Sequence, residues 1–201
     1  MKTQIITLFT ALVLSAGIAS TSNAEVAPKK QNVTVLTDIS AISKIEVRGN
    51  VELYISDGSA DQVKVYNKYY AESALVKSRN GVLSIASYKA EKLVVWVTAA
   101  DLRSVSVYDN AEVKSFGDLS KIEFAVDLHD NASAKLNLDA YSANVTLGDN
   151  ATADLSGKVE HFSLVHSIGS TINNYNLAAV HITESKTGMP VIAKEEDFVG
   201  L

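Results

Sequence analysis

The sequence contains no cysteine and only two prolines, Pro28 and Pro190, among its 201 residues. Without cysteine there is neither a disulfide nor a lipidated N-terminal cysteine, so we expect a soluble product stabilised by core burial and hydrogen bonding. Proline cannot donate a hydrogen bond to a β-ladder. Its absence from the middle of the chain therefore fits a continuous hydrogen-bonded sheet.

Basic residues and helical patterns are also scarce. The chain has 18 Lys and Arg against 23 Asp and Glu, a net charge of −5. Nucleic acids and anionic membrane surfaces bind to clusters of basic residues, so we expect neither as a partner. No segment keeps a 3.6-residue apolar period over three turns, which predicts almost no helix.

One long apolar run lies at the N-terminus, where residues 5–19 follow Lys2 and precede the small residues Ser22 and Ala24. This pattern is typical of a secretory signal peptide and predicts an exported protein, periplasmic or at the cell surface. No later run approaches the about 20 apolar residues of a membrane span, so none is expected in the mature chain. The predicted divisions are a signal peptide (1–24), a flexible leader (25–34), a β-solenoid domain (35–193) and a C-terminal tail (194–201).

What the sequence does contain is alternation of apolar and polar residues, which is typical of half-buried strands. Two such runs flank Gly49-Asn50, and turn signals follow at Asp57-Gly58 and Asn80-Gly81. The continuous apolar run 93–97 predicts a strand buried on both faces, with Trp96 in the core.

Three segments within this pattern repeat one another: residues 107–113, 128–134 and 147–153 each carry Asp-Asn-Ala between two alternating runs. Their aspartates are 21 and then 19 residues apart. A period of about 20 residues predicts a β-solenoid, in which coils stack as parallel sheets and bury their apolar faces against one another. The alternative is an antiparallel β-sandwich, which the two turn signals favour.

The runs around Arg48-Gly49-Asn50 and Asn80-Gly81, followed by the repeated small-residue turns, resemble the head GIN domain family of putative autotransporter adhesins. The resemblance covers about residues 40–185 and implies a secreted or surface-associated, single-stranded right-handed parallel β-helix without catalytic residues. The chain departs from the family in having Asp-Asn-Ala where Ser-Gly-Ala is frequent. It also lacks the lipidation cysteine that many relatives carry.

The repeated Asp-Asn pair is the sharpest candidate site. Asparagine tolerates the left-handed conformation of a tight corner, and stacked asparagines can bond along the ladder. Stacked aspartates would repel, so they point into solvent, bond to backbone amides, or hold a hard cation such as calcium. The asparagines of this structural column are Asn110, Asn131 and Asn150. The candidate calcium ligands are Asp109, Asp130 and Asp149.

A second candidate is the cluster of Tyr66, Tyr69 and Tyr70, whose rings could contact a glycan or a protein partner. The histidines match no metal-binding spacing such as His-Glu-x-x-His; they are His129, His161, His166 and His181. No nucleophile elbow or phosphate-binding loop occurs either. Polysaccharide-cleaving enzymes also use parallel β-helices, but the arginines Arg48, Arg79 and Arg103 share no repeat position.

These observations predict a non-enzymatic, exported β-solenoid that acts as a binding or adhesion-type module for an unknown glycan or protein surface. The expected alternatives are a calcium- or glycan-binding module built on the Asp-Asn column and, weakest, a polysaccharide-cleaving enzyme. No cofactor is expected apart from calcium. Open solenoid ends expose strand edges, so self-association into homo-oligomers is also expected.

Overall fold

The computed structural model describes residues 33–36, 39, 41–66 and 75–187, all within one compact unit, residues 31–201. These residues form strands and turns and contain no helix, which confirms the all-β prediction. All strands join one sheet. They are β1 (Val33–Leu36), β2 (Lys44–Gly49), β3 (Val51–Asp57), β4 (Gln62–Tyr66), β5 (Leu75–Arg79), β6 (Val82–Ser87), β7 (Leu93–Ala99), β8 (Ser104–Val107), β9 (Glu112–Ser115), β10 (Leu119–Leu128), β11 (Ser133–Leu147), β12 (Thr152–Ser167) and β13 (Thr171–Thr187).

The repeat pairs in parallel with itself. Ser104 of β8 lies opposite Ala125 of β10, 21 residues later, and Ser133 of β11 lies opposite Thr152 of β12, 19 residues later. The same pairing continues from β12 to β13, with one register shift between Asp154 and Ser156. The predicted period of about 20 residues is therefore the sequence separation between paired residues of neighbouring parallel strands from β8 to β13.

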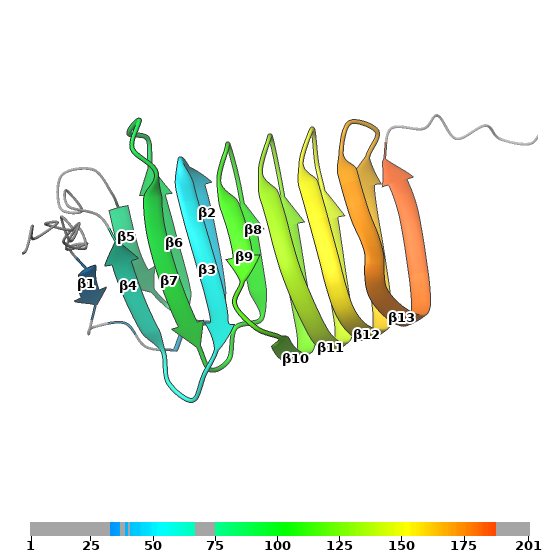
Figure 1. Cartoon of the computed structure of the whole chain (residues 1–201), viewed down its shortest axis with the longest axis horizontal. Coiled ribbons are helices and arrows are strands. Elements are labelled where there is room, and N and C mark those ends of the chain that lie inside the picture. Colours follow the sequence, from blue (N-terminus) through cyan, green and yellow to red (C-terminus); the bar gives the residue numbers. More distant parts are fainter. Residues whose placement is uncertain (1–32, 37–38, 40, 67–74, 188–201) are drawn as a thin grey trace, which may run out of the picture. The chain divides into compact units, whose positions relative to one another are not determined.

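The sheet is open and curled, so that one face encloses the core. Figure 1 shows β11, β12 and β13 bending along one edge, and each long strand thereby contributes to two facing parts of the sheet. The enclosed face is almost entirely apolar, with Phe124 and Phe162 as its largest side chains. The turn alanines are fully buried where the chain reverses; they are Ala111, Ala132 and Ala151.

The N-terminal half departs from a uniform stack of parallel coils. Although β6 and β7 follow β2 and β3 in sequence, they do not lie between these strands and the next coil. They lie on the opposite side, so that β2 pairs with both β6 and β8. Three pairs are antiparallel: β1 with β4, β4 with β7, and β5 with β6. Local alternation specifies strands but not their neighbours, so the sequence could not predict this order.

The predicted turns have different outcomes. Asn80 and Gly81 have φ of 50° and 79° and close the β5–β6 hairpin, as expected for a type I′ turn. Asp57-Gly58 closes no hairpin, because β4 pairs with β7 instead of β3. The strand β1 begins at Val33, inside the predicted leader. The signal peptide, the rest of the leader and the C-terminal tail lie outside the described residues.

In the Asp-Asn-Ala turns, the residue with the left-handed backbone conformation is not the one that the sequence predicted. The aspartates, and not the asparagines, have positive φ, with values of 62°, 59° and 50° at Asp109, Asp130 and Asp149. In each turn the alanine N–H donates to the carbonyl three residues earlier, as Ala132 does to His129 at 3.0 Å. A positive φ at the first central residue alone matches a type II′ turn, which places the aspartate there.

The aspartates line up along the turn edge and are joined by hydrogen bonds. The Asp109 amide donates to Asp130 Oδ2, and the Asp130 amide donates to Asp149 Oδ2, each at 3.0 Å. The Gly49 amide donates to Asp109 Oδ2 at 2.9 Å and extends this chain to β2. Each carboxylate thus satisfies an amide of the neighbouring coil.

These contacts predict the effect of changing Asp130. Asp130→Ala removes the acceptor of the Asp109 amide and places alanine at φ 59°, so we expect the free energy of unfolding to fall by about 1–2 kcal/mol in urea denaturation. Asp130→Asn is the matched control, because asparagine tolerates this conformation and keeps an acceptor oxygen. Equal losses in both variants would contradict the role assigned to the carboxylate and its backbone conformation.

Candidate functional site

Aromatic side chains gather on the outer face of β3, β7 and β9. Trp96 of β7 lies opposite Tyr54 of β3 in the parallel register, and their rings stack with centroids 4.7 Å apart at 20°. Phe116, directly after β9, meets the indole at 5.2 Å, and Tyr66 of β4 meets it at 6.4 Å. We call these four residues the aromatic face.

The position of Trp96 corrects the prediction that it belongs to the core. Every second residue of β7 is buried, starting at Leu93, whereas Val94 and Trp96 are half-buried and point outward. The sheet has one enclosed face, so a continuous apolar run still places alternate side chains outside. Among the described residues, the rings of Tyr54, Tyr66 and Phe116 lie against the indole on that side.

The predicted tyrosine cluster is only partly described. Tyr66 is half-buried on β4 and belongs to the aromatic face, and its contact with a glycan or a protein partner stays a prediction. Tyr69 and Tyr70 lie outside the described residues. Sequence reasoning missed Tyr54, Trp96 and Phe116 as members, although Tyr54 lies at an outward position of an alternating run.

A network of charges borders the aromatic face. Lys114 Nζ lies 2.8 Å from Glu52 Oε1 and 2.9 Å from Glu112 Oε1, and Tyr54 donates its hydroxyl to Glu52 Oε1 at 2.7 Å. The hydrogen bonds from Lys114 and then Tyr54 lower the pKa of the Glu52 carboxyl. The hydrogen bonds with Glu52 and then Glu112 raise the pKa of Lys114. Glu52 and Lys114 are therefore both charged at neutral pH.

Such a surface can bind a ring with an apolar face and polar edges. Aromatic side chains offer flat apolar area at little cost in conformational entropy, and the charged groups beside them can bond to hydroxyls. Phe116 remains 63% exposed, so the edge of the aromatic face is open to solvent.

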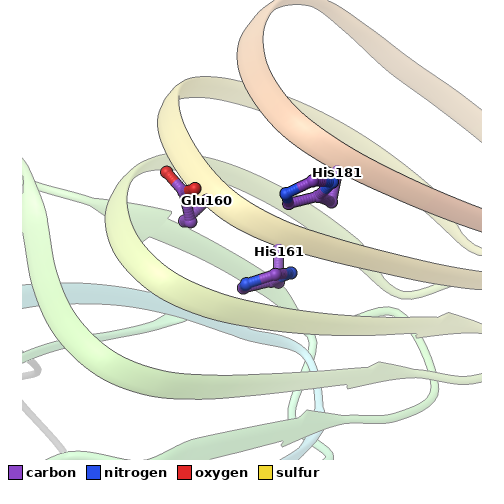
Figure 2. Close-up of side chains that lie close together, drawn as sticks. All are labelled: Glu160, His161 and His181. Carbon is purple, nitrogen blue, oxygen red and sulfur yellow. The ribbon is translucent and has the colours of Figure 1, made fainter.

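Where the long strands bend, Glu160, His161 and His181 lie together, as Figure 2 shows. His161 of β12 lies opposite His181 of β13, and their rings stack with centroids 4.8 Å apart at 13°. One donor atom from each of the three side chains lies within 4.8 Å of the other two. The sequence did not predict this cluster, because its residues match no known metal-binding motif. The signal was present, because the two histidines are separated by 20 residues, one repeat.

The Asp-Asn column has the arrangement described above, and in it Asp109 Oδ2, Asp130 Oδ2 and Asp149 Oδ2 accept backbone amides. These amides belong to neighbouring coils, so the bonds differ from the Asx turns within one corner that were expected as an alternative. Along the asparagine column, Asn131 Nδ2 donates to Asn110 Oδ1 at 3.5 Å. Calcium binding by the aspartates stays a prediction, which calorimetry with millimolar calcium would test.

The comparisons with known proteins agree with this architecture. Similar solved structures include a putative adhesin from Bacteroides fragilis (TM-score 0.68, 14% identity, covering 78% of this chain and 77% of that one). A putative adhesin from Parabacteroides distasonis has a TM-score of 0.60 at 14% identity, covering 78% and 79%. A putative lipid binding protein from the same species has a TM-score of 0.56 at 12% identity, covering 77% and 78%. At such identities these likenesses show the fold alone.

Three further observations concern this chain. No protein with a curated description matches it. Among the described residues, no helix is long and apolar enough to span a membrane. Residues 41–189, most of the chain, match the family model described as "Putative auto-transporter adhesin, head GIN domain". The chain therefore belongs to the head GIN domain family of putative auto-transporter adhesins.

Proposed function

We propose that this protein is an exported, non-enzymatic binding module of the adhesion type, and that its aromatic face binds carbohydrate. The observation that carries the proposal is Trp96, which stacks on Tyr54 on the outside of the sheet while Phe116 stands beside it, largely exposed. Large aromatic side chains that gather on the outside of a fold are suited to contact with a ligand or partner.

The chemistry beside the rings favours carbohydrate among the expected partners. A sugar ring presents C–H groups on its faces, which can stack on indole and phenyl rings, and hydroxyls on its edge. The Glu52 carboxylate and the Lys114 ammonium provide fixed acceptors and donors next to Tyr54. With a net charge of −5, the chain is poorly suited to nucleic acid.

The finer features of the fold and location belong to the same proposal. The parallel register between β10, β11, β12 and β13 supports a single-stranded parallel β-helix, for which we propose the right-handed winding implied by the family resemblance. The N-terminal pattern and the adhesin descriptions of the family support export to the periplasm or cell surface. The same descriptions support a non-enzymatic role.

The first prediction uses the single tryptophan of the chain, which makes indole fluorescence a local reporter of the aromatic face. We expect a glycan panel to contain a ligand that shifts Trp96 emission. On a glycan array, Trp96→Ala and Phe116→Ala should each reduce retention at least about tenfold, because stacking area is lost. Tyr88→Ala is the control, since Tyr88 is 73% exposed and outside the aromatic face. Retention that both substitutions leave intact, or a panel without any ligand, would count against carbohydrate binding.

The second prediction concerns the Glu52–Lys114 ion pair. The folded state lowers the pKa of Glu52, so the resulting stability is present above the ordinary glutamate value of about 4.3 and is lost as pH falls through the folded value. Glu52→Gln should cost about 1 kcal/mol of unfolding free energy at pH 6 and clearly less at pH 3. Urea denaturation at both pH values measures this, with the exposed Glu123→Gln as control. A difference between wild type and Glu52→Gln that does not depend on pH would refute it.

The third prediction concerns homo-oligomers, which we propose form through the edge of β13. Among the described strands, β13 pairs only with β12, and Tyr175 on it is 92% exposed. Further along β13, Glu184 and Lys186 oppose pairing by their charge, so we expect contact along the first half of the strand. Light scattering should show association at high concentration that Tyr175→Lys weakens. A strictly monomeric wild type would exclude this edge as an interface.

A further inference from the structure

The bend of β12 turns two consecutive side chains outward. Val159 and Phe162 are buried, whereas Glu160 and His161 between them both face away from the core. In a regular strand neighbouring residues point to opposite faces, so their placement on one side is a property of the corner. The parallel register then adds His181 from the next coil beside His161.

We propose that Glu160, His161 and His181 form a binding site for a divalent transition-metal ion of the Zn²⁺ class. One nitrogen of each imidazole and one carboxylate oxygen lie within 4.8 Å of one another. Tetrahedral zinc at about 2.0–2.1 Å from each donor needs donors roughly 3.3 Å apart. Ligation therefore requires these side chains to rotate toward a common point, while the β12–β13 ladder fixes the spacing of the backbone that carries them.

The donor set selects the class of metal. Two imidazoles with one carboxylate suit zinc, copper and nickel, whereas calcium and magnesium prefer a shell of oxygens. Three protein ligands leave at least one coordination position for water. The site is independent of the aromatic face, since it lies on other strands.

The surroundings help to hold the first histidine. The Tyr141 ring packs edge-on against one side of His161, with centroids 5.1 Å apart at 71°. A groove beside the corner is lined by Tyr141, Lys158, Glu160 and Val180 among others. Both histidines are exposed, so a metal ion can reach the cluster from solvent.

A bound metal would join β12 to β13 through side chains as well as through the backbone ladder. Within the described part of the chain, β13 is an edge strand that pairs only with β12, and much of it is exposed. Metal binding to the folded state would therefore stabilise this last coil more than the rest of the sheet.

The test is titration of the purified protein, without a polyhistidine tag, with ZnCl₂ by calorimetry. We expect one zinc ion per chain. His161→Asn, His181→Asn and Glu160→Gln should each weaken binding by about tenfold or more, because loss of a direct ligand exceeds the effect of losing an outer partner. Co²⁺ should give visible absorption bands typical of a low-coordinate site, and these should disappear in the His161→Asn/His181→Asn double variant.

Hydrogen exchange provides a second readout: Zn²⁺ should slow amide exchange in β13 in the wild type and not in the double variant. His129→Asn is the control and should bind zinc as the wild type does, since His129 stacks on Tyr108 outside the cluster. Absence of one-to-one binding, affinity that all three single variants retain, or one zinc ion shared by two chains would overturn the proposed site. A failure of glycan binding alone would leave it unaffected.

Discussion

The parallel hydrogen-bond register between successive coils is the constraint on which the other features depend. From β8 to β13 it places each paired residue beside its counterpart 19 to 21 positions away, as Leu128 lies beside Leu147 and Val107 beside Leu128. Any residue type that recurs with this period becomes a column along the sheet. Apolar columns facing inward form the core, and the same rule brings together the turn aspartates and His161 with His181.

The aspartate column shows how a like-charged row can be tolerated. Neighbouring carboxylates about 4.8 Å apart repel by roughly 1 kcal/mol in water. A hydrogen bond to a charged acceptor contributes about 1.5–3 kcal/mol, and Asp130 and Asp149 each accept one from the preceding aspartate amide. The row is therefore held by contacts between coils, and the left-handed turn conformation that aspartate accepts orients each amide toward the next carboxylate.

Much of the C-terminal half of the sheet was predictable, because residues 107–153 repeat visibly and repeats of one unit stack in chain order. The N-terminal half was not, since its alternating runs do not specify that β6 and β7 lie beyond β2 and β3. The site was harder still. Trp96 sits in an apolar run that gives no sign of a solvent-facing side, and Phe116 and Tyr66 reach it only through strand order. By contrast, the period-20 spacing of His161 and His181 could have identified their pairing.

Because apolar side chains fill the core, the side chains that could bind a ligand lie on the outside of the sheet and at its corners. Apolar residues fill most inward positions before the last coil, where Glu184 lies opposite Leu164 and Lys186 opposite the buried His166. Charges at inward positions of a terminal strand discourage another coil from stacking there. His166 Nε2 meets Glu184 Oε1 at 3.1 Å, so the change to polar residues starts one coil before the end. An interior closed in this way can vary little, whereas outward side chains such as Phe116 carry no core contact and are free to be selected for binding.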